Sequence, residues 1–378
     1  GNAFALPIPQ ERLALLSEAV GFGRNAKGGS GGMLYEGTNL NDSGAGSLRA
    51  GVESNEARWI VFNVSGNILL NSPIDVQSNK TIDGRGRSIT ITNYGLDVVN
   101  ASNVIITNLK IQDGAVDGIR LFGAATHDVW IHHVEISNFS DGAIDVTVGA
   151  TDVTISWSKV YNHGIPILLG ADDADTVDVN IRVTLHHNYF LNTGERHPRL
   201  RRGKVHAYNN YLRNWTNYGM RVHLAGQLLS EGNIFEAGSN KDGIVLGDSG
   251  ANKIKSSGDL LLNGAQVTQI NPAGVFAPAS FYTYAVEPAT EELRVKIAAS
   301  AGQQSGATPT PTPTPAPTTA SCDVNKDGSI SVVDVQLVVN QALGVAACAA
   351  DINKDGICNV VDVQRVVNAA LGGACVSP

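Results

Sequence analysis

Long apolar runs, excess positive charge and closely paired cysteines are all missing from this 378-residue chain. No apolar run approaches 18 residues, so no membrane-spanning helix is expected. With 27 Lys and Arg against 35 Asp and Glu, the formal net charge is -8, which argues against nucleic acid as a bulk partner. No C-x-x-C pair occurs, and a zinc site is therefore not expected. The 41 glycines favour short strands joined by turns.

Cysteine is absent from the first 321 residues and then occurs four times, at Cys322, Cys348, Cys358 and Cys375. An even number in a short segment is typical of disulfides in an extracellular module, with free thiols as the alternative. The chain begins GNAFALPIPQ, without methionine, as a processed or recombinant mature chain would. These features predict a secreted protein.

The composition changes abruptly at SGATPTPTPTPAPTTA, residues 305–320. Alternating Thr and Pro cannot form a helix or a central strand, so this stretch is expected to be an extended, semi-rigid linker. We expect a large domain over residues 1–301, a linker over 302–320 and a small cysteine-containing module over 321–378.

Nine-residue segments recur through the large domain. They are NVIITNLKI from residue 103, DVWIHHVEI from 128, DVTISWSKV from 152, RVTLHHNYF from 182, KVHAYNNYL from 204 and QLLSEGNIF from 227, with KTIDGRG from 80 one step earlier. Their starts lie 25, 24, 30, 22 and 23 residues apart, and each segment alternates apolar and polar residues. A period in the low twenties with short β segments predicts an all-β solenoid, a right-handed parallel β-helix.

Three further features refine this prediction. Asn188, Asn210 and Asn233 share the seventh position of successive repeats, so their amides are expected to stack as a hydrogen-bonded ladder, with chance enrichment at turns as the alternative. The 30-residue step marks an insertion, residues 163–180, expected to form a loop on one face. Helical apolar spacing in PQERLALLSEAVGF predicts a helix that caps the open end of the coil.

Aspartates gather in two neighbouring repeats. Asp141 and Asp145 lie four residues apart in SDGAIDV, and Asp117 lies about one repeat earlier in VDGIR. Three converging carboxylates repel one another and tolerate ionisation best around a hard cation. Oxygen donors without sulfur favour calcium over zinc. The alternative is that these aspartates are dispersed over the surface.

Positive charge is concentrated in TGERHPRLRRGKVH, residues 193–206. Arg196, Arg199, Arg201, Arg202 and Lys204 fall within nine positions of an acidic chain. A solvated basic face is one explanation and a site for an anionic ligand is the other. The histidines in and near this segment are expected to be packing residues rather than catalysts: His186, His187, His197 and His206.

The cysteine-containing module consists of one unit repeated 28 residues apart, DVNKDGSISVVDVQLVVNQALG and DINKDGICNVVDVQRVVNAALG. Each unit has the EF-hand loop pattern, with Asp in place of the usual Glu at position 12, followed by an amphipathic helix. The predicted calcium ligands of the first loop are Asp323, Asn325, Asp327, Ser331 and Asp334. Those of the second loop are Asp351, Asn353, Asp355, Asn359 and Asp362.

Several long motifs of the large domain occur in the order found in extracellular pectate lyases. They are AVGFGRNAKGGSGG, VWIHH, DGAIDV, VTISWSKVYNH, VTLHHNYF and RHPRLRRGKVHAYNNYL. Over roughly residues 15–250 the chain therefore resembles the pectate lyases of the parallel β-helix polysaccharide lyases. The resemblance implies calcium-assisted β-elimination of polygalacturonate by a monomeric catalytic domain.

The same resemblance assigns roles to individual residues. It implies that Asp117, Asp141 and Asp145 bind calcium. Arg196, which opens the R-x-P-x-x-R motif, would be catalytic, and Arg201, which closes it, would bind substrate. Arg199 is counted with the substrate-binding residues, with a solvated position as the alternative. The calcium acids favour a de-esterified, charged substrate over the esterified substrate of pectin lyases.

Two positions depart from the family pattern. His132 stands where the family usually has Asp in W-I-D-H, and Ile165 stands where it commonly has a substrate-binding Lys in N-H-x-K. Loss of a cation that contacts carboxylates is expected to weaken substrate binding or change the preferred pattern. A pectin lyase-like or catalytically weakened pectin-binding protein is therefore the alternative function, and a structural β-helix adhesin is a further one.

The duplicated loop-helix unit after a Thr-Pro linker resembles a dockerin, which implies a small all-α module that binds a cohesin on a scaffold or cell surface. Dockerins often carry a Ser-Thr-like pair at loop positions 10 and 11. Both repeats here have Val-Val, at Val332-Val333 and Val360-Val361. An apolar recognition surface, an unusual cohesin and a structural dimer are the open interpretations.

Overall fold

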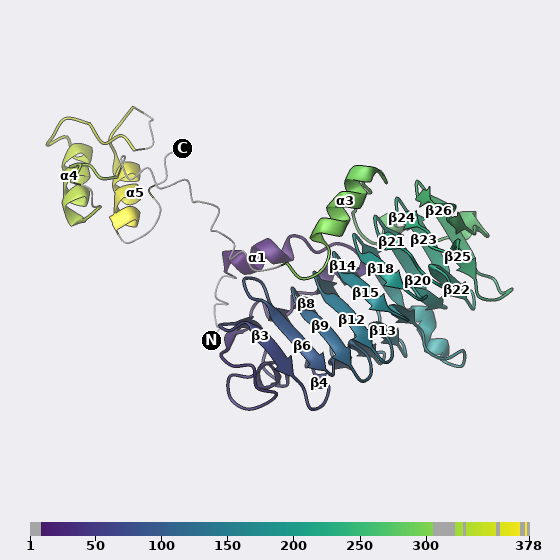
Figure 1. Ribbon diagram of the computed structural model, residues 1–378. Helices are drawn as coiled ribbons and strands as arrows, with labels where there is room; N and C mark the ends of the chain where they lie inside the picture. The colour runs from purple at the N-terminus through teal and green to yellow at the C-terminus, as the bar shows by residue number, and fades with distance from the viewer. Residues whose placement is uncertain (1–8, 305–321, 328–329, 353–355, 371–374, 376–378) are drawn as a thin grey trace. The chain divides into compact units, whose positions relative to one another are not determined.

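The computed structural model describes residues 9–304, 322–327, 330–352, 356–370 and 375. By its internal contacts the chain divides into two compact units, residues 1–307 and 308–378. The larger unit is a right-handed parallel β-helix whose coils stack strand on strand (Figure 1). The predicted fold class is therefore confirmed.

Three parallel sheets run the length of the solenoid. Sheet A has ten strands: β1 (Met33–Gly37), β2 (Arg58–Phe62), β5 (Lys80–Asp83), β8 (Val104–Thr107), β11 (Val129–His132), β14 (Val153–Ser156), β17 (Arg182–His186), β20 (Lys204–Tyr208), β23 (Gln227–Glu231) and β26 (Lys253–Ser257). The recurring segments found in the sequence supply β5, β8, β11, β14, β17, β20 and β23 of this sheet in order.

The other two sheets have nine strands each. Sheet B contains β3 (Gly66–Leu69), β6 (Ile89–Asn93), β9 (Lys110–Gly114), β12 (Glu135–Phe139), β15 (Lys159–His163), β18 (Tyr189–Thr193), β21 (Tyr211–Arg213), β24 (Ile234–Glu236) and β27 (Leu260–Leu262). Sheet C contains β4 (Ile74–Asp75), β7 (Leu96–Val99), β10 (Ile119–Phe122), β13 (Ile144–Thr147), β16 (Ile167–Leu169), β19 (Arg199–Arg201), β22 (Met220–His223), β25 (Asp242–Leu246) and β28 (Gln266–Val267).

The hydrophobic core fills the inside of the coil. Successive side chains of a strand point to opposite faces of its sheet, so every second residue turns inward. In sheet C, for example, Ile144 and Val146 of β13 are fully buried in the core, whereas Asp145 between them faces outward. Matched registers stack the inward apolar residues from coil to coil, as Ile119, Ile144 and Ile167 show, and the outward positions likewise form rows along the sheet.

The predicted asparagine ladder is present inside the coil. The Asn188 side-chain amide donates to Asn210 Oδ1 at 2.9 Å, and the Asn210 amide donates to Asn233 Oδ1 at 2.9 Å. All three side chains are buried. Because a buried amide is costly unless it is paired, the ladder fixes the vertical register of three coils.

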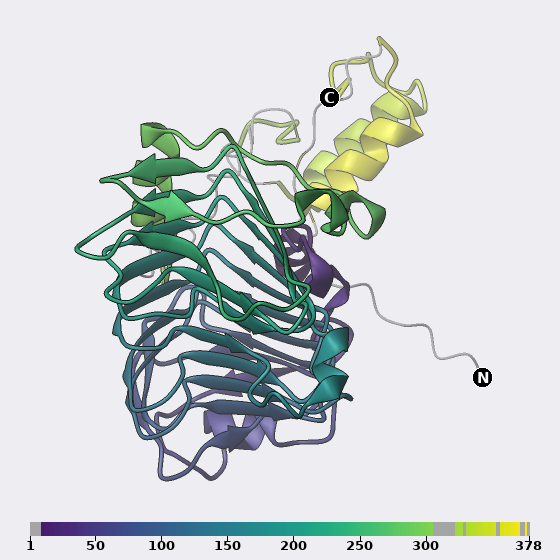
Figure 2. The same cartoon turned by 90° about the vertical axis from the view of Figure 1, so that its right-hand side faces the viewer.

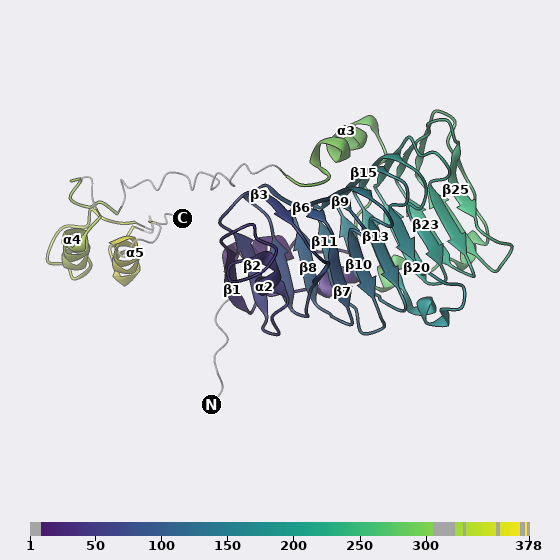
Figure 3. The same ribbon diagram turned by 60° about the horizontal axis from the view of Figure 1, so that its bottom comes forward.

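The N-terminal helix forms as predicted but not where it was predicted. α1 (Gln10–Leu16) packs Leu15 against Trp59 and Trp130, which lie on the outer face of sheet A. The helix therefore covers the side of the coil, as Figure 2 shows. Instead, α2 (Leu48–Val52) places its apolar residues in the core next to β1, β2 and β4 at the N-terminal end (Figure 3).

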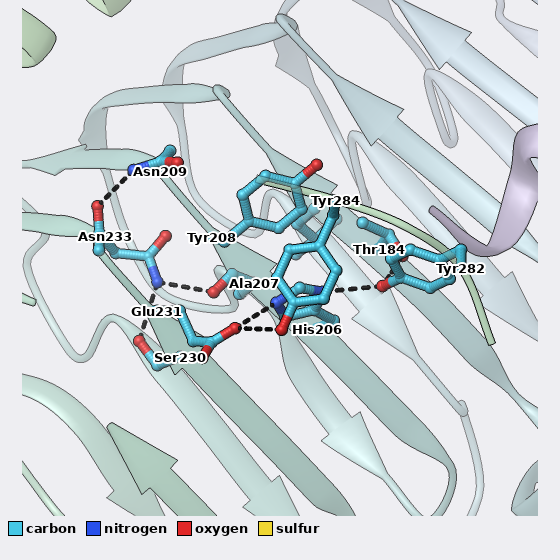
Figure 4. Close-up of polar contacts among 12 residues, drawn as sticks. Thr184, His206, Ala207, Tyr208, Asn209, Ser230, Glu231, Asn233, Tyr282 and Tyr284 are labelled. Atoms are coloured by element: carbon cyan, nitrogen blue, oxygen red, sulfur yellow. Dashed lines mark hydrogen bonds and ion pairs between the residues drawn. The ribbon is translucent and has the colours of Figure 1, made fainter. Parts of the chain in front are cut away.

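The C-terminal segment of the larger unit returns along the outside of the coil, first over sheet A at Tyr282 and then over sheet B at the last helix. It contains η3 (Pro272–Gly274), η4 (Pro278–Ser280) and α3 (Glu291–Ser300). Beneath it, His206 lies between the Tyr282 hydroxyl at 2.7 Å and the Glu231 carboxylate at 3.0 Å (Figure 4). Burial lowers the pKa of His206, so the ring is held neutral as a packing residue.

The other three histidines expected to pack are buried as well. His186 and His187 lie in contact with each other under the same C-terminal cover, and His187 also contacts Glu287 at 2.8 Å. His197 contacts the Thr193 hydroxyl at 2.6 Å and the Gly219 carbonyl at 2.8 Å. Each ring has partners that suit a neutral imidazole, which agrees with packing roles.

The packing against the coil continues beyond the predicted domain end at residue 301. Gly302 N–H donates to the Trp157 carbonyl at 2.7 Å, and Gln304 N–H donates to Asn108 Oδ1 at 2.8 Å. The first residues assigned to the linker are thus part of the β-helix surface, and the exact domain boundaries stay a prediction.

The smaller unit contains two helices, α4 (Val332–Ala342) and α5 (Val360–Ala370), which pack against each other through Val338 and Val366. Disulfides join Cys322 to Cys375 and Cys348 to Cys358, so the sulfur atoms are paired as expected for an extracellular module. Across the described residues of both units, none of the helices has the length and apolar character needed to cross a membrane.

Candidate active site

The three candidate calcium aspartates come together at the N-terminal ends of two neighbouring strands of sheet C, β10 and β13. Asp117 lies in the turn before β10, Asp141 lies in the turn between β12 and β13, and Asp145 lies on β13. Asp117 Oδ1 accepts a hydrogen bond from the Gly142 N–H at 2.9 Å, which ties the first aspartate to the turn that carries the second. A Cβ at Gly142 would lie 2.2 Å from Asp145 Oδ1 and 3.1 Å from Asp117 Oδ1, so glycine leaves room between the two carboxylates.

These carboxylates repel one another in a partly buried place. Burial, followed by the charges of Asp117 and Asp141, raises the pKa of Asp145 to about 8. Burial also raises the pKa of Asp117 to about 6, with Asp141 adding to the shift and the Gly142 N–H opposing it. Without a cation the three groups cannot all be ionised at neutral pH.

The donor set fits a hard cation. Asp145 Oδ1 is buried and has no hydrogen-bond partner among the described residues. All three candidate ligands offer carboxylate oxygen, which suits calcium. Within the described part of the chain, however, no three His, Cys, Asp or Glu side chains form a ready-made metal-binding group. The aspartates therefore converge without being preformed as a closed cage.

Arginines continue the same outward face of sheet C. In one row, Asp145 is followed by Leu168, Arg199 and Arg221 at matched positions of β13, β16, β19 and β22. In the adjacent row Arg201 is matched with His223. Burial, followed by the charges of Arg201 and two further arginines, lowers the pKa of Arg199, which shows how densely positive this end of the face is.

Arg196 lies in the turn that leads into β19. Its backbone φ is 68°, and its carbonyl accepts a hydrogen bond from Ile167 N–H at 2.8 Å, which fixes the turn to β16. The guanidinium Nε lies 3.5 Å from Glu195 Oε1 and is buried without a hydrogen bond among the described residues. Arg196 also makes the largest contribution that opposes the raised pKa of Asp145, so this arginine lies near the acidic cluster.

Arg201 is already engaged. Its Nε donates to Asp173 Oδ1 at 2.8 Å, and one of its terminal nitrogens donates to the Gly170 carbonyl at 2.9 Å. Arg202 donates to the backbone carbonyl of Asp173 at 2.9 Å. By contrast, Lys204 begins β20 in sheet A, away from the arginine rows.

The predicted insertion is only partly a loop. Its first half supplies β16, a full member of sheet C, and its second half forms the loop that ends in η2 (Thr176–Asn180). That loop carries Asp173 to Arg201. The insertion therefore contributes β16 to the sheet that carries the site, and a loop that contacts Arg201 on that sheet.

Two arginines at this face were not among the sequence candidates. Arg120 of β10 pairs with Asp97 at 2.5 Å and occupies the position beside Asp145. Arg221 of β22 follows Arg199 in the row. The sequence repeat could have identified both arginines. The arginine of GIR lies one coil from Asp145 and that of GMR lies one coil from Arg199, and each precedes an inward-facing apolar residue.

The two departures from the family pattern occupy different places. His132 is on sheet A, where it contacts Ser156 Oγ at 2.9 Å and Glu18 at 3.3 Å, so its exchange does not alter sheet C. Ile165 lies in the turn before β16, and its carbonyl accepts a hydrogen bond from Ala143 N–H at 3.3 Å. Ile165 thus lies directly beside the aspartate turn and is the departure that concerns the site.

In the smaller unit the backbone of each predicted calcium loop is hydrogen-bonded to the aspartate at position 12. Asp334 is buried and accepts from the N–H groups of Val324 at 2.8 Å and Ser331 at 2.8 Å. Asp362 likewise accepts from Ile352 N–H at 2.7 Å and Asn359 N–H at 2.9 Å. The two loops therefore share the same hydrogen-bonding pattern around the position-12 aspartate.

The remaining predicted ligands of these loops hydrogen-bond to their own loop backbone. Asp323 Oδ1 and Asn325 Oδ1 accept from Asp327 N–H at 3.1 and 3.0 Å, and Asp351 Oδ2 accepts from Gly356 N–H at 2.8 Å. Asn353 and Asp355 lie outside the described residues.

Fold and site together define a polysaccharide lyase of the parallel β-helix class. Residues 63–306 match the pectate lyase family. Over 260 residues the chain is 36% identical to pectate lyase 1 of Chamaecyparis obtusa, covering 62% of this chain and 69% of that protein. Over 325 residues it is 34% identical to pectate lyase 2 of Ambrosia artemisiifolia, covering 77% of this chain and 81% of that protein.

The solved structures agree. The crystal structure of jun a 1, the major allergen from cedar pollen, superimposes with a TM-score of 0.71 at 31% identity and covers 78% of this chain and 96% of that one. The chain belongs to the pectate lyase family. Residues 321–371 match the type I dockerin domain, so the chain combines a lyase with a dockerin.

Proposed function

We propose that this protein cleaves α-1,4-polygalacturonate by calcium-dependent β-elimination on the outward face of sheet C and releases unsaturated oligogalacturonides. The observation that carries the proposal is the juxtaposition, on one face, of the cluster Asp117, Asp141 and Asp145 with a row of arginines. A polymer with a carboxylate on each sugar has the charge pattern that such a face would bind.

Calcium is the cation that the aspartates suit. Asp117, Asp141 and Asp145 would hold it, and the buried, unpartnered Oδ1 of Asp145 supports a cation there. When bound, calcium neutralises charge on a substrate carboxylate and so stabilises the carbanion-like transition state. The raised pKa values of Asp117 and Asp145 add support, because a nearby cation would remove the repulsion that causes them.

Elimination requires a base for the proton on C5 and departure of the C4 oxygen. Arg196 is the proposed base, acting directly or through a water molecule that it holds. The backbone carbonyl of Arg196 is bonded to Ile167 of β16, which fixes the turn, and the charge of the side chain acts on the nearby Asp145. An arginine is normally protonated, and a base must first lose that proton. At this end of the face, burial and the charges of neighbouring arginines lower the pKa of Arg199, so the surroundings here disfavour a charged guanidinium.

The other arginines are proposed to bind uronate carboxylates. Arg199 and Arg221 face outward in the row that starts at Asp145, and Arg201 lies beside them in the next row. Guanidinium groups bind carboxylates in a planar, two-bonded geometry, which suits a substrate that must be held in one orientation. With Ile165 in place of a lysine, these arginines supply the cations that contact substrate.

The test is a spectrophotometric assay of the full-length protein with polygalacturonate and calcium, in which the unsaturated product absorbs in the ultraviolet. Activity is expected in calcium and none is expected with a chelator. Arg196→Ala is expected to lower kcat by at least about a hundredfold, as for loss of a general base. Arg87→Ala, a change in the turn that joins β5 of sheet A to β6 of sheet B, serves as the matched control.

The pectin-binding alternative predicts a different result. Retained binding of polygalacturonate without ultraviolet absorbance at any alkaline pH would reject the lyase proposal. Activity on methyl-esterified pectin that persists in chelator would instead favour a pectin lyase-like reaction, since that reaction would not need the three aspartates.

We further propose that the dockerin module binds calcium and anchors the enzyme outside the cell to a cohesin-bearing scaffold or surface. The family match, the two disulfides and the repeated position-12 aspartates support this. The proposed ligands are Asp323, Asn325, Asp327, Ser331 and Asp334 in the first loop and Asp351, Asn353, Asp355, Asn359 and Asp362 in the second.

This proposal is tested by the melting temperature of the module within the full chain. Calcium is expected to raise it, and Asp334→Asn combined with Asp362→Asn is expected to abolish the increase. A calcium-dependent complex with an immobilised type I cohesin would support anchoring, and the same double variant should lose it. An unchanged melting temperature in calcium would contradict the paired loops.

A further inference from the structure

We propose that Asp173 is an internal competitor for the substrate on Arg201: its carboxylate occupies the guanidinium that a uronate carboxylate needs, and it thereby sets how tightly the enzyme binds polygalacturonate. The inference rests on the proposed function of Arg201. It assigns a specificity-determining role to a residue of the insertion loop.

The contact resembles the one expected with substrate. A side-chain carboxylate oxygen of Asp173 accepts from Arg201 Nε at 2.8 Å, a charge-assisted bond between the same two chemical groups that a uronate and an arginine would use. Arg202 donates to the Asp173 carbonyl at 2.9 Å and so holds the loop in place from the backbone.

The two ends of the loop are anchored so that the Asp173 carboxylate lies beside Arg201. At the start, Gly170 has a φ of 85°, and a Cβ there would lie 3.0 Å from the Arg201 Cβ, so glycine lets the loop leave β16 beside Arg201. At the end, buried Asp178 accepts from Gly149 N–H at 2.8 Å and fastens η2 to the coil. Between these anchors Asp172 Oδ1 accepts from Ala174 N–H at 2.8 Å, which shapes the turn that carries Asp173.

The ion pair between Asp173 and Arg201 can be displaced by a substrate carboxylate. The Arg201 side chain is 12% exposed, whereas the Asp173 side chain is 72% exposed. An ion pair with one partner in solvent contributes little to stability, because water and salt compete for it. A polyuronate that contacts several arginines at once can therefore displace a single loop carboxylate and swing it into solvent.

Competition and orientation make opposite predictions. If Asp173 competes with substrate, removal of its charge frees Arg201 and strengthens binding. If Asp173 instead orients Arg201 for substrate, removal of its charge weakens binding. The sign of the change in affinity therefore decides between them.

The experiment compares wild type with Asp173→Asn, which keeps the size of the side chain and the backbone contact to Arg202. KM for polygalacturonate and the Kd of tetragalacturonate by calorimetry are expected to fall by about two- to fivefold, the range that an exposed ion pair allows, while kcat stays unchanged. Asp172→Asn is the control, since it removes the same charge from the same loop while its Oδ1 can still accept from Ala174.

A double variant separates the local effect from general charge. In an Arg201→Ala background, Asp173→Asn should produce no further fall in Kd, because the contested guanidinium is gone. An unchanged or larger Kd for Asp173→Asn alone, or an equal fall in the Asp172→Asn control, would overturn the inference. If wild type neither cleaves polygalacturonate nor binds tetragalacturonate, the proposed function itself fails; cleavage by wild type with an unaltered Asp173→Asn variant rejects the competitor role alone.

Discussion

Asp145 and Arg199 lie in one outward-facing row of sheet C, with Leu168 of a single intervening strand between them. Neighbouring strands are about 4.8 Å apart, so two strand steps separate the two residues by about 10 Å. An acidic site and a basic site thus face the same side of one rigid sheet. The predictions below test this face, the interior that holds it rigid and the module attached to it.

Asp145→Asn is expected to abolish lyase activity and yet to stabilise the calcium-free β-helix. The Asp145 carboxylate is buried beside Asp117 and Asp141, and its pKa of about 8 means that its ionisation opposes folding as pH rises above the ordinary value near 4. At pH 8 the neutral amide should raise the melting temperature by about 2–4 °C for each kcal/mol of repulsion that it removes.

Differential scanning calorimetry with and without calcium measures this effect. The calcium-dependent increase in the β-helix transition should disappear in Asp145→Asn. Asp128→Asn is the control, because this aspartate in the turn before β11 of sheet A undergoes the same change away from the aspartate cluster. A calcium-free Asp145→Asn protein less stable than wild type would contradict the proposed repulsion.

Asn210→Ala is expected to destabilise the β-helix by about 3 kcal/mol or more. Asn210 accepts from the backbone and side-chain amides of Asn188 and donates to Asn233, so its loss leaves buried polar groups without partners. Urea unfolding followed by circular dichroism gives the change. Asn192→Gly removes an exposed amide from a left-handed position and should change the free energy by less than about 0.5 kcal/mol.

The β-helix is expected to lose stability as pH falls from about 6.5 to about 4. Burial lowers the pKa of His197 to about 4. Between pH 6.5 and pH 4 this histidine therefore binds a proton in the unfolded chain but not in the folded protein. Above 6.5 both states are neutral and the full contribution is present. The difference for this fully buried ring corresponds to about 3 kcal/mol.

The check is the slope of unfolding free energy against pH, measured in saturating calcium so that the site aspartates stay ionised. His197→Gln should flatten the slope between pH 6.5 and 4, whatever its effect on absolute stability. His127→Gln changes an exposed histidine and should leave the slope as in wild type. Equal slopes for wild type and His197→Gln would refute the assignment.

The two disulfides should contribute unequally to the dockerin module. Cys322–Cys375 spans 53 residues and Cys348–Cys358 spans 10, so closing the longer loop removes more entropy from the unfolded chain. Paired Cys→Ser variants should lose about 4 and about 3 kcal/mol respectively. Each variant serves as the control for the other, and a larger loss for the short loop would contradict the entropic explanation.

Much of the fold was predictable because the sequence pattern of a solenoid recurs with the period of its coils. Each strand pairs with the strand one coil away, so the period of the segments from residues 80 to 227 specified which strands become neighbours in sheet A. The asparagine ladder followed from the same period. The position of α1 could not be predicted from this period. The spacing of its apolar residues indicates that one face of the helix is buried, but not which surface covers that face.

The candidate site was predictable only in part. The convergence of Asp117, Asp141 and Asp145 follows from the repeat, whereas their roles and that of Arg196 remain predictions. The contact between Asp173 and Arg201 could not be predicted, because the insertion breaks the period that relates one coil to the next.

By itself the sequence determined the parallel β-helix, the aspartate cluster and the duplicated calcium-loop module, since each of these is encoded by residues at a fixed spacing. Tertiary structure alone decided which cysteines pair, that α1 covers sheet A, and that a loop carboxylate is bound to Arg201. These features depend on the distance between segments that no repeat connects, and that distance exists only once the coils have stacked.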